Sequence, residues 1–136
     1  MKRNILIAGD LLAIAIITLS GFATHGELGI TFAPRMAALY FPLSLAWFLL
    51  APWFGLFRPE VVSDIRQIWR PALVMIFATP AALVLRGQLL NMPVLPLFAL
   101  ILGGTCALGM IAWRGFALLI SRRGKKGSGS EYPLPN

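Results

Sequence analysis

The stretch LFALILGGTCALGMIAWRGFALLI, residues 97–120, decides how the rest of this chain must be read. About 20 apolar residues, rising ~1.5 Å each in a helix, are enough to cross a hydrocarbon core of ~30 Å. This run exceeds that length, and Arg114 is its only charged residue. A helix so long and so apolar is unusual inside a small soluble protein, so the stretch predicts a membrane span.

The composition of the whole chain agrees with a membrane protein. Hydrophobic residues make up 58% of the 136 residues and charged residues only 12%, about half the roughly 25% typical of soluble domains. The formal net charge of +7 comes from basic residues that lie between apolar runs rather than on one face. This distribution fits the topology of a membrane protein and not a nucleic-acid surface. The expected surroundings are therefore the lipid bilayer, with no nucleic-acid partner.

Three further apolar runs precede the opening stretch. The first resembles a signal peptide, but Asp10 interrupts it and it is long enough to span, which favours an uncleaved helix. The predicted fold is all-α, an integral membrane four-helix bundle over residues 1–121. Residues 122–136 are basic and then rich in Gly, Ser and Pro, and they are predicted to form a disordered cytoplasmic tail. The predicted spans cover about residues 5–23, 36–57, 71–90 and 97–120.

Residues 58–71, RPEVVSDIRQIWRP, separate spans two and three. Pro59 suits the first position of a helix, because its missing N–H would be unpaired there in any case. Helical spacing places the apolar residues of this segment on one face, namely Val61, Val62, Ile65, Ile68 and Trp69. The pattern predicts a short amphipathic helix in the membrane interface, and a charged loop is the alternative.

The loop charges predict the orientation of the spans. Basic residues are concentrated in cytoplasmic loops of membrane proteins. Nine of them fall on one side of the predicted bundle, whereas only Arg35 and Arg86 fall toward the other. Both termini and residues 58–70 are therefore expected in the cytoplasm. The nine are Lys2, Arg3, Arg58, Arg66, Arg70, Arg122, Arg123, Lys125 and Lys126.

Three ionisable residues, Asp10, Arg86 and Arg114, lie within predicted spans. Such a residue costs about 2.5–3.5 kcal/mol at mid-helix, so it is usually paired or lines a polar path. Asp10 and Arg114 have opposite charges and similar expected depths, which predicts an ion pair between them. A rival account has Arg114 reaching lipid phosphates while Asp10 is protonated. A structural clamp is favoured over a proton or anion pathway, because few polar residues continue a path.

Arg86 is expected to reach the outer boundary, where His25 and Glu27 follow span one. A contact between Glu27 and Arg86 and an approach of Arg86 to lipid phosphates are equal alternatives. His25 stands alone, so it predicts neither a metal ligand nor a pH sensor. One Cys and one His cannot build a zinc cluster, and no metal or cofactor is expected. Small residues on the last span, Gly103, Ala107 and Gly109, are candidates for helix packing within the bundle or between copies. Trp47 and Cys106 are interpreted as packing residues.

Single residues at wide spacing also carry a resemblance to a known family. Over most of residues 9–116 the chain is similar to a prokaryotic family of four-span membrane proteins, the domain of unknown function DUF3054. The resemblance implies a four-helix fold in a prokaryotic plasma membrane, and it implies no activity. The residues that carry it are Asp10, Gly26 beside His25, Phe41-Pro42, Arg58-Pro59, Thr79, Leu85-Arg86 and Trp113-Arg114.

No catalytic triad, carboxylate pair or glycine-rich phosphate loop is recognisable in the sequence. The favoured hypothesis is therefore a non-enzymatic accessory or scaffold subunit of a membrane assembly, with lipid, other membrane subunits or further copies of itself as partners. The alternative is an oligomeric transport or channel subunit for an ion or small solute, using Asp10, Arg86 and Arg114. A lipid-modifying enzyme is disfavoured, because neither a metal cluster nor a nucleophile is evident.

Overall fold

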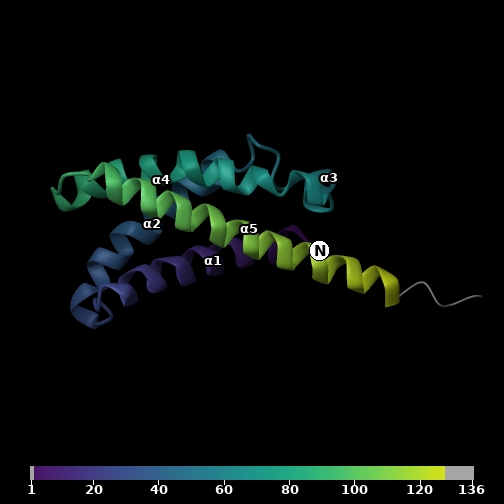
Figure 1. Cartoon of the computed structure of the whole chain (residues 1–136), viewed down its shortest axis with the longest axis horizontal. Helices are drawn as coiled ribbons and strands as arrows, with labels where there is room; N and C mark the ends of the chain where they lie inside the picture. Colours follow the sequence, from purple (N-terminus) through teal and green to yellow (C-terminus); the bar gives the residue numbers. More distant parts are fainter. Residues whose placement is uncertain (1, 128–136) are drawn as a thin grey trace, which may run out of the picture.

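The computed structural model describes residues 2–127, and within them the chain is a bundle of long helices (Figure 1). Four of the described helices have the length and apolar composition of membrane spans. The expected all-α four-helix membrane bundle is thereby confirmed. The long helices are α1 (Arg3–Thr24), α2 (Ala33–Leu50), α4 (Trp69–Leu90) and α5 (Pro96–Gly127), and short helical segments are η1 (Ile30–Phe32), α3 (Pro59–Val62) and η2 (Ile65–Gln67).

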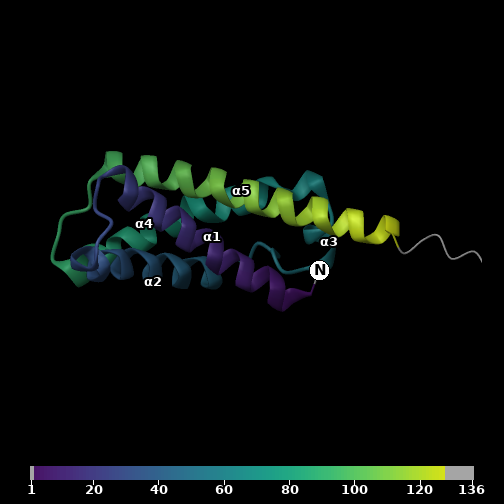
Figure 2. The same cartoon turned by 90° about the horizontal axis from the view of Figure 1, so that it is seen from below.

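Each long helix packs against two others. Helix α1 contacts α2 and α5, and α4 contacts the same two helices from the other side. The N-terminus, α3 and the last turns of α5 lie toward one end of the bundle, and the α1–α2 and α4–α5 connections lie at the other (Figure 2). We call these the terminal end and the loop end. This arrangement places residues far apart in the sequence, at the start of α1 and late in α5, beside each other.

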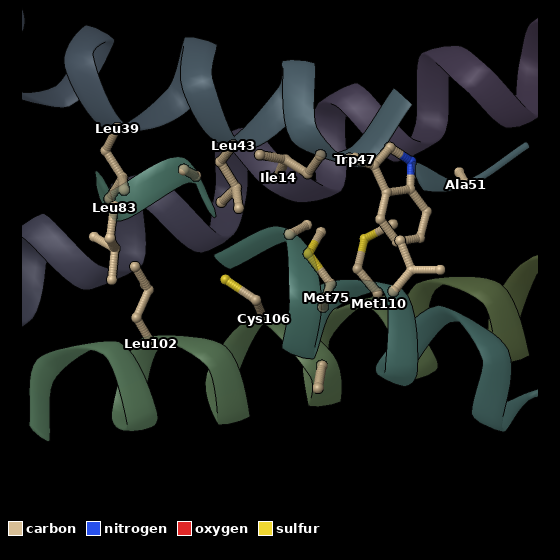
Figure 3. Close-up of a cluster of buried hydrophobic side chains, with 14 of the residues drawn as sticks. Ile14, Leu39, Leu43, Trp47, Ala51, Met75, Leu83, Leu102, Cys106 and Met110 are labelled. Atoms are coloured by element: carbon tan, nitrogen blue, oxygen red, sulfur yellow. The ribbon is translucent and has the colours of Figure 1, made fainter. Parts of the chain in front are cut away.

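The core between the helices is apolar and closely packed (Figure 3). Ile14, Leu43, Trp47, Met75 and Met110 are completely buried at its centre. Large apolar side chains also cover the outside of the four long helices, with exposed fractions as high as 75% at Leu100. An apolar outer surface is unfavourable in water but is what a helix needs when it faces lipid.

Span two differs from its expected extent of residues 36–57. Helix α2 ends at Leu50, and residues 51–57 form consecutive turns. Pro52 lacks a backbone N–H, and Gly55 has a φ of +68°, a left-handed conformation that ends regular helix and suits glycine. The turns fold Leu56 back into the bundle, where it is 1% exposed.

The segment between spans two and three is also less regular than its apolar periodicity predicts. Two short helical segments, α3 and η2, replace the single amphipathic helix expected over residues 61–69. The break falls at Ser63 and Asp64, where the Asp64 carboxylate accepts a hydrogen bond of 2.9 Å from the Arg66 N–H. Such a local bond competes with the helical backbone pattern, which explains why the periodicity overestimates the helix.

Helix α5 is longer than the span expected at residues 97–120. It continues to Gly127, so residues 122–127, which the sequence analysis assigned to a disordered tail, are helical. Lys and Arg are good helix formers, and Lys125 and Lys126 in the last turn complement the negative end of the helix dipole. The rest of the predicted tail, residues 128–136, lies outside the described residues.

Candidate functional site

The charged centre of the bundle is Asp10 on α1, whose side chain is completely buried. Its Oδ1 accepts a hydrogen bond of 2.9 Å from the indole Nε1 of Trp113 on α5. Its Oδ2 accepts two bonds, one of 3.2 Å from Nε1 of Trp47 on α2 and one of 2.6 Å from Nη2 of Arg114 on α5. The structure therefore pairs Asp10 with Arg114, as their similar depth led us to expect, and adds two indole donors.

Arg114 is held from several directions. Its Nη1 donates a bond of 2.9 Å to the Leu56 carbonyl, which the turns after α2 bring into the bundle. The guanidinium carbon lies 5.8 Å from the ring centre of Trp47 and 5.5 Å from that of Phe57, within the range of cation–π attraction. The side chain is 7% exposed. We use the name Asp10 cluster for Asp10, Trp47, Trp113, Arg114 and the Leu56 carbonyl, which together join α1, α2 and α5.

A glycine makes this geometry possible. A Cβ at Gly9 would lie 1.8 Å from Cζ2 of Trp113, so the indole ring occupies the space that any larger residue would fill. The ring can lie against the α1 backbone, and its N–H reaches the carboxylate of the next residue. Trp113 and Arg114 are neighbours on α5, and neighbours on a helix point about 100° apart. They therefore bind the two oxygens of Asp10 separately.

The cluster is closed to large ligands. Both Asp10 oxygens already accept bonds, and the cavity beside Arg114 has a volume of about 20 Å³, enough for a single water. Removing two charges from water is costly, and their close pairing with further hydrogen bonds offsets this cost. Removing one partner would leave the other charged and buried. The arrangement is suited to joining helices.

The remaining charged candidates lie at the loop end, away from the Asp10 cluster. The Oε1 atom of Glu27 lies 3.6 Å from Nη1 of Arg35, and Glu27 forms no other ion pair within residues 2–127. The contact between Glu27 and Arg86, one of the two alternatives for Arg86, is therefore not formed among these residues. Arg86, His25, Glu27 and Arg35 instead line a common cavity of about 290 Å³, which we call the loop-end cavity. The three intramembrane charges are thus divided between two sites.

The apolar core separates these two sites. Figure 3 shows Leu39, Leu83 and Leu102 toward one side of the core and Trp47 and Ala51 toward the other. The first three line the loop-end cavity, whereas Trp47 belongs to the Asp10 cluster. Completely buried apolar side chains, including Leu43, Met75 and Cys106, fill the space between them.

The small residues singled out on α5 serve packing inside this chain. Gly103 and Ala107 are buried, and a Cβ at Gly103 would contact Thr79 of α4 at 3.8 Å. A Cβ at Gly109 would lie 2.5 Å from Cδ1 of Ile17 on α1, so the glycine allows α1 and α5 to approach closely. Cys106 is buried in the core, where it packs as expected.

The sequence did not assign Trp47, Leu56 or Trp113 to the Asp10 cluster, and it gave no role to Gly9, which lies against the Trp113 ring. Trp47 was interpreted as a packing residue only, and its N–H has a second role. A signal was available, because a buried indole N–H needs an acceptor and Asp10 is a carboxylate within the spans. Within the described part of the chain, no group of three or more His, Cys, Asp or Glu residues is placed to hold a metal ion.

A family model described as "Protein of unknown function (DUF3054)" matches residues 7–117. The matched region contains both the Asp10 cluster and the residues that line the loop-end cavity. No curated protein and no solved structure matches the chain significantly. The chain therefore belongs to the DUF3054 family, as its widely spaced motif residues suggested, and the family itself assigns no activity.

Proposed function

We propose that this DUF3054 protein is a non-enzymatic membrane subunit, acting as an accessory or scaffold component of a larger membrane assembly. The observation that carries the proposal is the closure of the Asp10 cluster. Its carboxylate accepts three hydrogen bonds and is completely buried. Charges that conduct or exchange protons need access to water or to a polar path. These charges instead join α1, α2 and α5 through hydrogen bonds.

The connections between the helices support the same proposal. Residues 25–32, 51–68 and 91–95 connect the long helices, and none of these segments is long enough to form a separate catalytic domain. What remains for interaction is the apolar outer surface, including Leu100 and Leu108, which are 75% and 70% exposed. A bundle with such a surface is suited to packing beside other membrane helices, where association depends on close van der Waals contact.

The proposed orientation places both termini in the cytoplasm of a prokaryotic cell, because nine basic residues lie toward the terminal end. Reporter fusions at Gly26, Gln67, Asn91 and Ser128 test it. The expected locations are outside, inside, outside and inside, in that order. A cytoplasmic signal at Asn91 would contradict the proposed topology.

Purification from the native membrane tests the accessory role. The tagged protein is extracted in two mild detergents, and its native mass and polypeptide content are measured. A constant ratio to the same additional membrane polypeptides in both detergents is expected. A homogeneous oligomer of this chain alone, which also conducts ions or solutes after reconstitution into vesicles, would overturn the proposal.

The second candidate function is an oligomeric transport subunit, and one observation favours it. The loop-end cavity contains Arg35 and Arg86 and stops at the apolar core, as a site accessible from one side would. Vesicles containing the purified protein test this function by anion uptake. Uptake lost in Arg86→Gln and retained in Arg122→Gln, a change on the exposed end of α5, would support transport.

A further inference from the structure

The loop-end cavity lies among α1, α2, α4, α5 and the connection from Met92 to Leu95. Its volume of about 290 Å³ is near the lower end of the range for small-molecule sites. Much of its wall is apolar and comes from four different helices, with Phe22, Leu39, Leu83 and Leu102 among the side chains. A cavity with such walls can hold the apolar part of a small ligand.

Two polar groups of this cavity have no partner within the described residues. The Nε of Arg86 is buried and makes no hydrogen bond there, and Arg86 forms no ion pair within residues 2–127. Thr18 is 4% exposed, and its hydroxyl also lacks a partner. Seven buried side-chain polar atoms, including the Nε of Arg114, lack a partner within the described residues, and two of the seven, on Thr18 and Arg86, line this cavity. Buried donors without partners are destabilising, and an acceptor bound in the cavity would satisfy both.

The charges around the cavity favour an anion. Arg35 and Arg86 face a single carboxylate, that of Glu27, which leaves one positive charge in excess. The ion pair of Glu27 with Arg35 is 3.6 Å long, greater than the 2.7–2.9 Å of a charge-assisted hydrogen bond. A cation would be repelled by this excess, and a neutral apolar molecule would leave Arg86 and Thr18 unpartnered.

We propose that the loop-end cavity binds an amphipathic monoanion, with its carboxylate or phosphate group at Arg86 and Thr18 and its apolar body among the apolar walls. The planar guanidinium of arginine suits both kinds of oxyanion, because it can donate two parallel bonds. The anion is either a soluble organic acid or the head group of an anionic lipid, since the chemistry recognised is the same. The site does not depend on the accessory role proposed above.

Binding is tested with the full chain in phosphatidylcholine nanodiscs, using radiolabelled octanoate as the soluble probe and empty nanodiscs as background. Saturable binding of one octanoate per chain is expected. Arg86→Gln should weaken it by about tenfold or more, because a hydrogen bond to a charged group is lost. Thr18→Val, which keeps the shape and removes the hydroxyl, should weaken it by about threefold. Arg122→Gln, outside the cavity, should bind as the unchanged protein does.

A second arm identifies the source of the anion. The protein is placed in nanodiscs of phosphatidylcholine with phosphatidylglycerol, and retained lipid is measured by native mass spectrometry. If phosphatidylglycerol is retained and prevents octanoate binding, the ligand is a lipid head group. If octanoate binds regardless of phosphatidylglycerol, the ligand is a soluble acid. Either result supports the anion site.

A cavity-filling pair of variants keeps the proposal falsifiable if Arg86→Gln does not fold. Gly21 lines the cavity, and a Cβ there would meet no atom within 4 Å, so Gly21→Leu is expected to occupy part of the space. Gly104 is exposed on α5 and equally free of neighbours, which makes Gly104→Leu the matched control. Gly21→Leu should lose binding, and Gly104→Leu should retain it. Absence of saturable binding of both probes, or equal binding by the two leucine variants, would overturn the proposal.

Discussion

The two ends of this bundle use arginine in opposite ways. At the terminal end, Arg114 is 7% exposed, and it donates to Asp10 and to the Leu56 carbonyl. At the loop end, Arg86 lines a cavity of about 290 Å³ and forms no ion pair within the described residues. The comparison shows that a charge within an apolar helix has no fixed meaning. Its role depends on whether the neighbouring helices supply a partner.

The difference predicts unequal effects on stability. A paired buried charge stabilises the fold only through its partner, whereas an unpartnered charge beside an open cavity can be removed at little cost. The variants below test this contrast, beginning with the largest expected change. Each is compared by its free energy of unfolding in mixed micelles.

Arg114→Gln should be the most destabilising substitution. It leaves the Asp10 carboxylate buried without its opposite charge, a loss of about 3–5 kcal/mol in other buried pairs. Arg86→Gln, the same change at the loop end, should cost less than about 1 kcal/mol because no ion pair is broken. Equal destabilisation by the two substitutions would refute the contrast between the ends.

The neutral double variant, Asp10→Asn with Arg114→Gln, tests whether the two residues stabilise the fold as a pair or independently. It should recover much of the stability that either single variant loses, because no unpaired charge remains. An exchange of the two charges should not recover it. The indole N–H groups of Trp47 and Trp113 would then point at a guanidinium, which accepts no hydrogen bond. Simple addition of the single losses would show that the two residues act independently.

Gly9→Ala should be the next most harmful change. The added Cβ would overlap the Trp113 ring, and overpacking of this kind typically costs about 1–3 kcal/mol. Gly21→Ala is the matched control on the same helix, because its Cβ meets open space. It should be neutral or stabilising by up to about 1 kcal/mol, since alanine favours helix more than glycine does. Similar losses for both variants would contradict the close approach of Trp113 to α1.

Part of this architecture could be predicted from the sequence, because it depends on features that can be counted along the chain. Apolar run length predicts the spans, since lipid requires each backbone group to be bonded within its own helix. Depth along the helices was sufficient to suggest the pairing of Asp10 with Arg114. Both inferences need only the order of residues and the thickness of a bilayer.

The rest depends on how the helices rotate and approach one another. The Leu56 carbonyl reaches Arg114 only because α2 ends early and the following turns fold back, whereas hydropathy alone extends the span to residue 57. The role of Gly9 requires knowing that Trp113 faces it from 104 residues away in the chain. The sequence also left two alternatives for Arg86, a contact with Glu27 or an approach to lipid phosphates, and it gave no indication that Glu27 pairs with Arg35.

Trp113→Phe should be less destabilising than Arg114→Gln or Gly9→Ala. It removes one hydrogen bond to Asp10 and keeps most of the ring that packs against Gly9. Hydrogen bonds between membrane helices are worth about 1 kcal/mol or less, so a loss near this value is expected. Trp53→Phe is the control, because Trp53 is 88% exposed and donates no side-chain bond within the described residues. If Trp113→Phe is no more destabilising than Trp53→Phe, the indole N–H of Trp113 contributes nothing to the Asp10 cluster.

Glu27→Gln should have the smallest effect on stability and a distinct effect on binding. Its ion pair with Arg35 is 3.6 Å long, and the two side chains are 33% and 39% exposed. Pairs of this kind contribute little, so a change of at most about 0.5 kcal/mol is expected. The substitution also removes the only carboxylate among the residues lining the loop-end cavity and leaves Arg35 and Arg86 facing it without compensation. Octanoate should therefore bind more tightly to Glu27→Gln than to the unchanged protein, by about threefold, and this gain should diminish with added salt. Weaker octanoate binding in a folded Glu27→Gln variant would show that the carboxylate helps to hold the ligand, contrary to an anion site.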